Sequence, residues 1–430
     1  MSTPRPFSFS SDDKDEERTV DLINLIAVVP RPDGTSSTVI YVEHDDANPT
    51  ALPQLKFSKA TSPPPNLPPM NISNDREIHI VVSTGSGTGK ADTFFDEAVK
   101  PLLRALFPDS HRFFKIHPTK SATSIHDLTN DVFFPQANSG SLLRIILLSG
   151  DGGVIDLVNG LLSKPASVEY KPPQVVLLPL GTANALYHSI NAGRENTWGL
   201  KALALGNYQP LPIFTATFSL GARLLINEAR SEEELPKNPQ TGSPILHGAV
   251  VCSWAMHASL VADSDTAEYR KFGVERFKMA AKEALFPADG SMPHPYKAKV
   301  SILRGNNWTP LEKEEHMYVL ATMVSNLEKT FKISPASKPL DGSLHLVHFG
   351  PTDGNEVMRI MGLAYQGGKH VDDPFVLYEN IEGLRIQFEG KEEDARWRRI
   401  CIDGKIVRLE KDGWVELRKE TQRVVDVACN

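Results

Sequence analysis

Apolar runs of strand length alternate with helical patterns in the first half of the chain. The runs occupy 78–82, 113–117, 142–148 and 175–178, and segments with helical spacing follow them at 91–106, 124–133, 154–162 and 183–190. Strands that alternate with helices are typical of a parallel sheet with helices on its faces. We therefore expect an α/β domain over 76–208.

From residue 209 the pattern changes to short β-rich segments separated by turns. These segments lie at 213–220, 224–228, 249–254, 296–303, 317–325, 343–349, 375–378, 384–388, 399–402 and 414–417. Many short strands at close spacing predict a sandwich or barrel-like fold. One helical insert is expected at 266–286, where apolar residues recur on one helical face. The predicted fold class is thus α/β + β, with a β-rich, sandwich-like domain over 209–420.

The residues before the α/β domain differ in composition from the rest. Residues 1–18 are rich in Ser, Pro and Asp, which predicts a disordered tail. Strands are expected within 19–60, and we expect them to join the β-rich domain. The proline runs of 61–75 predict a stiff, extended linker.

Length, charge and cysteine content narrow the class of protein. At 430 residues the chain is too long for a single core, so two domains are expected. The net charge of −7 argues against a nucleic-acid binder. The chain has only three cysteines, which favours the reducing cytoplasm. They do not have the spacing of metal ligands, so we expect no metal site built from protein side chains. No apolar stretch reaches the length of a membrane span, so any membrane contact would be peripheral.

Three glycine-rich corners follow predicted strands, and the first lies between 82 and 91. Its small residues leave backbone N–H groups free for phosphate oxygens at the start of a helix, although a flexible turn is the alternative. The corner consists of Ser83, Thr84, Gly85, Ser86, Gly87, Thr88, Gly89 and Lys90.

The second corner places a carboxylate, Asp151, between glycines. It reads Ser149, Gly150, Asp151, Gly152, and a carboxylate at such a position can act as a base toward a hydroxyl. Asp-Gly is also a common turn, and it recurs elsewhere in this chain.

The third corner contains Gly181, Thr182 and Asn184, where helix capping is the alternative role. Because ligands of open α/β folds bind at the carboxyl ends of the strands, the three corners together predict one ligand site.

In this order, the three corners resemble the diacylglycerol-kinase-like catalytic domain shared by sphingosine, ceramide and diacylglycerol kinases. The resemblance implies an α/β nucleotide-binding domain, a β-rich lipid-binding domain, and ATP with Mg²⁺. It places residues 83–90, Thr119 and Thr182 at ATP, together with the glycine corners, and makes Asp151 the base. Asp403-Gly404 matches a late Asp-Gly near the nucleotide, although Lys405 follows where the family usually has Glu.

The segment 253–277 is similar to the sphingosine kinase branch. The resemblance implies that Arg270 and Arg276 hold phosphate, with Gly273 interrupting the helix between them. An acid before this helix would hold the lipid head group, and both Asp263 and Asp265 are candidates. His257 could approach the head group or be a structural histidine.

The resulting prediction is an ATP-dependent lipid kinase that phosphorylates the primary hydroxyl of a sphingoid long-chain base. Ceramide or diacylglycerol kinase is the alternative within the class, and a catalytically idle lipid-binding relative is the alternative outside it. The first corner starts with Ser83-Thr84, which differs from the usual family pattern, so a catalytically inactive relative remains an alternative. The expected partners are a lipid substrate and a peripheral membrane surface, without nucleic acid, and a homodimer is an open alternative. The expected location is the cytoplasm, with peripheral membrane association.

Overall fold

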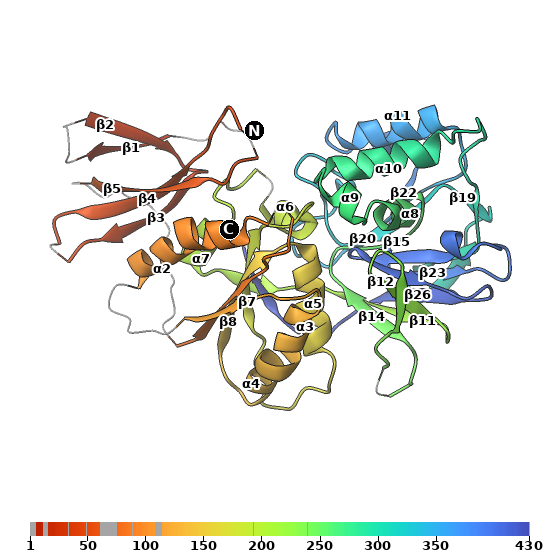
Figure 1. The fold of residues 1–430 in the computed structure, drawn as a ribbon, viewed down its shortest axis with the longest axis horizontal. Helices are drawn as coiled ribbons and strands as arrows, with labels where there is room; N and C mark the ends of the chain where they lie inside the picture. Colours follow the sequence, from red (N-terminus) through yellow and green to blue (C-terminus); the bar gives the residue numbers. More distant parts are fainter. Residues whose placement is uncertain are drawn as a thin grey trace.

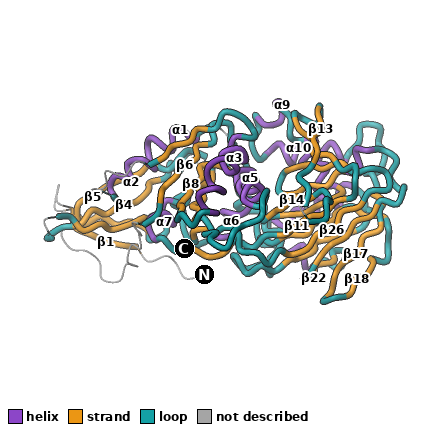
Figure 2. The backbone as a smooth tube through the Cα atoms, turned by 90° about the horizontal axis from the view of Figure 1, so that it is seen from below, coloured by secondary structure: helices purple, strands orange, loops and turns teal. Residues whose placement is uncertain are grey.

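The computed structural model describes residues 6–11, 16–32, 34–48, 50–60, 75–87, 89–107, 114–191, 193–238 and 240–429. These residues form an N-terminal sheet, a central α/β domain and a β-rich domain, which follow one another along the long axis (Figure 1, Figure 2).

The α/β domain is built on a six-stranded sheet with the order β10-β27-β9-β8-β6-β7. Strands β7, β6, β8, β9 and β27 are parallel, and β10 is antiparallel to β27. Its strands are β6 (Glu77–Val82), β7 (Lys115–Pro118), β8 (Leu143–Ser149), β9 (Gln174–Pro179), β10 (Tyr208–Pro210) and β27 (Asp426–Ala428). Its helical segments are α1 (Ala91–Phe94), η1 (Phe95–Val99), α2 (Lys100–Leu106), α3 (Ser124–Leu128), η2 (Thr129–Phe133), α4 (Phe134–Asn138), α5 (Asp151–Leu161), α6 (Ala185–Asn191) and α7 (Leu200–Leu205).

Strand β8 is buried on both faces, because helices cover both sides of the sheet. Ile145 and Leu147 pack in the cluster that contains α5, whereas Ile146 and Leu148 pack in the cluster that contains α1, α2 and α7. A strand buried on two sides appears in the sequence as a continuous apolar run. The predicted parallel sheet with helices on its faces is therefore confirmed.

The last strand, β27, lies beyond the predicted β-rich domain of 209–420 and belongs to the α/β sheet. Strand β27 pairs in parallel with β9 and antiparallel with β10, so the C-terminal residues complete the α/β sheet. Its three residues are too short to carry a recognisable strand pattern, and all of them are buried.

The N-terminal strands form an antiparallel sheet of their own, with the order β2-β1-β5-β4-β3. They are β1 (Pro6–Ser11), β2 (Glu16–Asp21), β3 (Leu25–Pro30), β4 (Ser37–Glu43) and β5 (Gln54–Ala60). Two expectations are therefore wrong. Parts of 1–18 lie in β1 and β2 rather than in a disordered tail, and the strands of 19–60 do not join the β-rich domain. The predicted linker lies outside the described residues, apart from residue 75.

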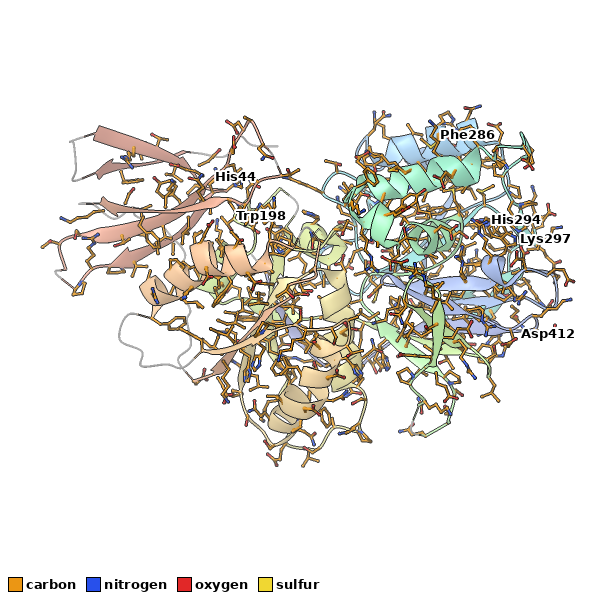
Figure 3. All side chains as sticks on the ribbon, viewed as in Figure 1. His44, Trp198, Phe286, His294, Lys297 and Asp412 are labelled. Atoms are coloured by element: carbon orange, nitrogen blue, oxygen red, sulfur yellow. The ribbon has the colours of Figure 1, made fainter. Side chains whose placement is uncertain are left out.

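The N-terminal sheet packs on the α/β domain because both surfaces are apolar. Ile40 and Val42 share a buried cluster with Phe94 of α1 and Leu203 of α7. At the same junction His44 bonds to the carbonyl of Asn196 at 2.8 Å, and Figure 3 shows His44 and Trp198 between the two units. The apolar outer faces of α1 and α7 thus determine where the sheet docks.

Two large antiparallel sheets form the β-rich domain, as the sandwich-like prediction requires. Their orders are β14-β11-β26-β23-β17-β18 and β13-β12-β25-β24-β15-β20-β21-β22, and β16 and β19 form a separate pair. The strands are β11 (Phe214–Phe218), β12 (Arg223–Ile226), β13 (Ser231–Glu234), β14 (Ile245–Gly248), β15 (Val251–Ala255), β16 (Tyr296–Lys297), β17 (Lys299–Arg304), β18 (Asn307–Pro310), β19 (Glu315–His316), β20 (Tyr318–Thr322), β21 (Leu344–Phe349), β22 (Leu377–Ile381), β23 (Gly383–Gln387), β24 (Arg399–Ile402), β25 (Lys405–Arg408) and β26 (Trp414–Lys419).

Helices cover one side of the eight-stranded sheet, and α10 and α11 lie side by side at its outer edge (Figure 1). They are α8 (Met256–Asp263), α9 (Ala267–Arg270), α10 (Glu275–Leu285) and α11 (Gly354–Ala364), with short 3₁₀ turns η3 (Lys369–Asp372) and η4 (Ala395–Arg398). The predicted insert at 266–286 is present as α9 and α10, but helical structure already begins at Met256, directly after β15.

In the described part of the chain, no helix combines the length and the apolar character that a membrane span requires.

Candidate active site

The three glycine corners converge at the carboxyl ends of β6, β8 and β9. A Cβ atom added at Gly150 would lie 2.7 Å from the Cα of Gly181, and one added at Gly87 would lie 2.9 Å from the carbonyl carbon of Gly181. Contacts this short exclude a side chain at Gly87 or Gly150 unless the backbone moves. Gly87 also has φ +54°, which only glycine adopts readily. The structure therefore confirms that the three corners lie next to one another.

Side-chain hydrogen bonds hold two of these corners in shape. Asn184, with φ +54°, accepts from the N–H of Gly181 at 2.9 Å and donates to the carbonyl of Gly181 at 3.0 Å. The hydroxyl of Thr84 donates to the carbonyl of Thr119 at 3.0 Å, and the N–H of Thr84 donates to the hydroxyl of Thr119 at 3.2 Å. Asn184, Thr84 and Thr119 thus shape the loops.

A cavity of about 600 Å³ opens beside the corners and extends between the two domains into the β-rich domain. Its volume lies within the usual range for small-molecule sites. One end is glycine-rich and polar, with Ser86, Gly87, Ser149, Gly150, Asp151, Gly152, Gly181, Thr182, Asn184, Asp403, Gly404 and Lys405. The other end is mostly apolar, with Met256, Leu260, Val261, Phe277, Ala281, Leu285, Tyr318, Leu327, Phe331, Met358, Met361 and Tyr365. Such a cavity suits a ligand with one polar end and one long apolar end.

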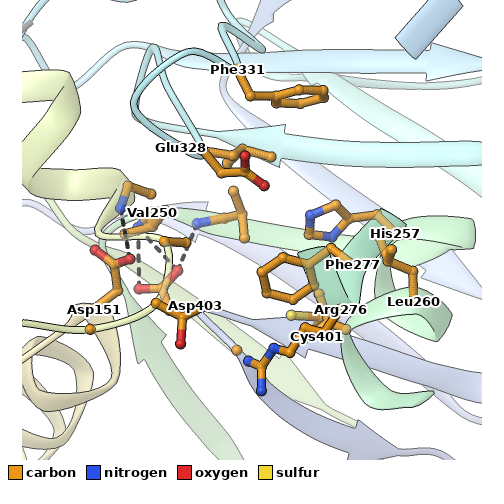
Figure 4. Close-up of a pocket in the computed structure, with 18 of the residues that line it drawn as sticks. Asp151, Val250, His257, Leu260, Arg276, Phe277, Glu328, Phe331, Cys401 and Asp403 are labelled. Atoms are coloured by element: carbon orange, nitrogen blue, oxygen red, sulfur yellow. Dashed lines mark hydrogen bonds between the residues drawn. The ribbon is translucent and has the colours of Figure 1, made fainter. Parts of the chain in front are cut away.

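Asp151 begins α5 and faces the cavity from the second corner (Figure 4). Its carboxylate accepts the first two N–H groups of α6, from Ala185 at 2.8 Å and Leu186 at 3.0 Å. Burial raises the pKa of Asp151, although these hydrogen bonds oppose the shift. A carboxylate with a raised pKa is a stronger proton acceptor, and the two hydrogen bonds fix its position.

Asp403 lies near Asp151 and is held by the turn before β15. It accepts from the N–H groups of Ala249 at 2.6 Å, Val250 at 3.0 Å and Val251 at 2.6 Å. Burial raises the pKa of Asp403 to about 7, and the charge of Asp151 acts in the same direction. Gly404 and Lys405, the next two residues, also line the cavity.

Arg270 and Arg276 meet at one carboxylate, because the helix between them is interrupted. Helix α9 ends at Arg270, Gly273 has φ +54°, and α10 begins two residues later. Arg270 binds Asp265 with two bonds of 2.9 and 3.0 Å, and Arg276 binds it at 3.3 Å. Arg276 lines the cavity, and its buried Nε has no hydrogen-bond partner among the described residues. The predicted interruption at Gly273 is thus confirmed.

Asp263, one of the two predicted head-group acids, does not line the cavity. It binds Arg396 and Arg399 at 2.8 Å each. Although burial opposes the shift, hydrogen bonds and charge from Arg399 and Arg396 lower the pKa of Asp263. Counting back from Arg270 does not reveal these partners, because the two arginines come from a segment more than 130 residues later. Asp265 does line the cavity, but with two guanidinium partners.

His257 lines the cavity on the side of α8 (Figure 4). Its Nδ1 bonds to the hydroxyl of Ser253 at 2.7 Å. Burial lowers the pKa of His257 to about 4, so the ring is neutral near pH 7.

The first corner divides into a part that faces the cavity and a part that does not. Ser86 and Gly87 line it, whereas Ser83, Thr84, Gly85, Gly89, Lys90 and Thr119 do not. Thr88 lies outside the described residues. The ammonium group of Lys90 donates to the carbonyl of Thr50 at 3.3 Å, so it binds the loop between β4 and β5.

Glu328 and Lys405 also line the cavity, and the sequence pattern does not predict either of them as a site residue. Glu328 lies in the loop after β20 and lines the cavity. Lys405 pairs with Asp156 of α5 at 2.6 Å and also lines it. Glu328 stands beside Lys329 and Thr330 in the sequence, a polar stretch that indicates an exposed loop. No local signal marks it as a cavity residue.

Residues 77–216 match the model of the diacylglycerol kinase catalytic domain. This part of the chain, which holds the three glycine corners, is thus similar to the catalytic domain of that kinase family. Sphingosine kinase 1 from Homo sapiens is similar to it over 340 residues at 22% identity, covering 72% of this chain and 82% of that protein. Sphingosine kinase 1 from Rattus norvegicus is 23% identical over 341 residues, with the same coverage.

The fold has a solved counterpart as well. A crystal structure assigned to a diacylglycerol kinase from Bacillus anthracis str. Sterne matches with a TM-score of 0.54 at 16% identity, covering 84% of this chain and 99% of that chain. At this identity the match shows the shared fold, in agreement with the predicted two-domain class.

Proposed function

We propose that this chain transfers a phosphoryl group from ATP to the primary hydroxyl of a sphingoid long-chain base. The observation that carries the proposal is the single cavity in which the glycine corners and Asp151 form one end and apolar side chains form the other. A nucleotide triphosphate suits the first end, and a lipid chain suits the second. The similarity to sphingosine kinase 1 supports the choice of lipid.

The glycine-rich end fits a nucleotide phosphate. Gly87 and Gly150 let the corners pack against the third corner, and a Cβ at Gly152, which lines the cavity, would meet no atom within 4 Å, so a phosphate could approach the backbone closely there. The buried Nε–H of Arg276 lacks a partner among the described residues and would donate a hydrogen bond to a phosphate oxygen. Among the described residues, no three His, Cys, Asp or Glu side chains are grouped to hold a metal ion. Protein-bound Mg²⁺ typically uses one or two carboxylates together with substrate phosphates, and Asp151 and Asp403 are the carboxylates at this end.

Within this proposal Asp151 is the base. Its raised pKa and its fixed position would let one carboxylate oxygen accept the proton of the lipid hydroxyl. Bound Mg²⁺ would neutralise charge on the phosphates, while the protein mainly positions the two reactants. The first two N–H groups of α6 keep Asp151 oriented for this role.

We also propose that the protein works at a membrane surface as a peripheral protein. Large apolar side chains are exposed on and beside α10 and α11: Phe272 is 54% exposed, Phe286 44% and Met358 47%, and Met358 also lines the cavity. A lipid substrate would reach the apolar end of the cavity from such a surface.

The test is a lipid panel with labelled ATP and Mg²⁺, presented in mixed micelles. The purified protein should phosphorylate a sphingoid base faster than a ceramide or a diacylglycerol. Asp151→Asn should reduce turnover by about 10²–10⁴-fold, the usual contribution of a general base, while a thermal melt shows an intact fold. An empty panel would refute the kinase proposal and favour an idle lipid-binding relative. Normal turnover by Asp151→Asn would remove Asp151 from the role of base.

A further inference from the structure

Four carboxylates line the cavity, and three of them are compensated by other groups. Asp151 accepts two backbone N–H groups and Asp403 accepts three. Asp265 has two guanidinium partners. The fourth, Glu328, has no ion pair within the described part of the chain.

Glu328 projects into the middle of the cavity. In Figure 4 its carboxylate points into the space between Val250 and His257, with Phe331 on the same wall. Its side-chain bond comes from the hydroxyl of Tyr365 at 3.4 Å, which is long for a hydrogen bond between oxygens.

Lys278 is the positive charge that acts on Glu328, and it also lines the cavity, but the two form no ion pair in the described part of the chain. Lys278 faces it from α10, but the ammonium group of Lys278 donates to Glu275 at 2.7 Å. Burial raises the pKa of Glu328, while Lys278 and Tyr365 oppose the shift and Glu275 adds to it. A half-buried carboxylate in this position is costly unless a ligand provides hydrogen-bond donors and positive charge.

An ammonium group would satisfy this carboxylate better than a neutral head group. It offers three N–H donors and a full positive charge, and a charge pair is stronger in a partly buried site than in water. The neighbouring His257 adds no competing positive charge near pH 7, because burial keeps it neutral. The amide of a ceramide or the ester of a diacylglycerol would leave Glu328 without a counter-charge.

We infer that Glu328 binds the ammonium group of a long-chain amino alcohol, and that this residue, rather than Asp263 or Asp265, sets the preference for a cationic lipid. The inference rests on the proposed lipid kinase function and names the determinant of its substrate class. Both predicted aspartates are paired with arginines, whereas Glu328 lines the cavity without an ion pair among the described residues.

The experiment compares sphingosine with its N-acetyl derivative, which keeps the chain but carries no charge. Glu328→Gln removes the charge and keeps the shape, Glu328→Asp keeps the charge, and Glu312→Gln removes an exposed acid outside the cavity as the matched control. KM and kcat are measured with both lipids, and equilibrium binding of sphingosine is measured without ATP.

For Glu328→Gln we expect KM for sphingosine to rise about 10- to 100-fold with little change in kcat, as the loss of a charged hydrogen bond predicts. KM for the N-acetyl derivative should stay within about twofold of wild type, the scale of an uninvolved surface change. Glu328→Asp should keep the preference for the amine, and Glu312→Gln should match wild type. Weaker sphingosine binding by Glu328→Gln should accompany the change in KM.

The inference is overturned if Glu328→Gln keeps the wild-type KM for sphingosine, or if it loses both lipids equally. If the wild-type protein phosphorylates neither lipid, the kinase proposal fails, and the binding measurement still decides the role of Glu328. Selective loss of sphingosine binding by Glu328→Gln would then support the inference. Equal binding by the variant, or no binding by wild type, would overturn it.

Discussion

Gly150→Ala tests whether the contact between the second and third corners matters for activity. The added Cβ would lie 2.7 Å from the Cα of Gly181, where ordinary contacts begin at 3.4 Å. The corners would have to separate by about 0.7 Å, because the atom in the way is backbone and cannot rotate aside. Gly150 immediately precedes Asp151, so the displacement would reach the proposed base directly.

The expected magnitudes follow from this geometry. Overpacking of a rigid contact typically costs about 1–3 kcal/mol, which corresponds to a fall in Tm of about 2–10 °C for a domain of this size. A displacement near 1 Å at a reacting centre costs about 100-fold in rate, so we expect kcat/KM to fall about 10- to 100-fold.

The assay combines a thermal melt with steady-state kinetics on the lipid substrate that the panel identifies. Gly152→Ala is the matched control for stability, because a Cβ at Gly152 meets no atom within 4 Å and alanine favours the helix. Its Tm should equal or exceed that of wild type. Wild-type Tm and wild-type kcat/KM in Gly150→Ala would refute the close approach of the two corners.

Further substitutions test the other parts of the site. Gly87→Val should raise KM for ATP at least about 10-fold. The positive φ at this position is unfavourable for valine, and the added side chain would clash with the third corner. An unchanged KM would remove the first corner from the nucleotide site. Asp263→Ala should lower the free energy of unfolding by about 1–3 kcal/mol, because Arg396 and Arg399 lose their partner; a selective loss of the amine lipid at full stability would restore Asp263 as the head-group acid. Asp265→Ala should raise KM for ATP, because Arg276 loses the bond that orients it, and unchanged kinetics would contradict that role.

The three glycine corners and the parallel sheet could be predicted because the sequence patterns that indicate them are local. Continuous apolar runs mark strands buried on both faces, and the glycines mark places where two backbones touch. The rule that ligands lie at the carboxyl ends of parallel strands then brings Gly87, Gly150 and Gly181 together without any knowledge of the tertiary contacts.

The features that sequence reasoning missed depend on distant segments. Asp263 looked available because its partners, Arg396 and Arg399, lie far away in the sequence. Glu328 looked like a surface residue because its neighbours in sequence are polar. The N-terminal strands have apolar residues on both faces, such as Ile40 and Val39, which lie in different clusters. That pattern predicts a covered strand without saying what covers it.

The return of β27 to the central sheet has a consequence for biosynthesis. Strand β10 pairs with β27 and not directly with β9, so β9 obtains its second neighbouring strand only from β27, which follows the whole β-rich domain in sequence. While the ribosome is still making the β-rich domain, that apolar edge is open to wrong pairing. Final assembly of the α/β domain therefore follows synthesis of the β-rich domain, and deletion of β27 should impair folding rather than chemistry.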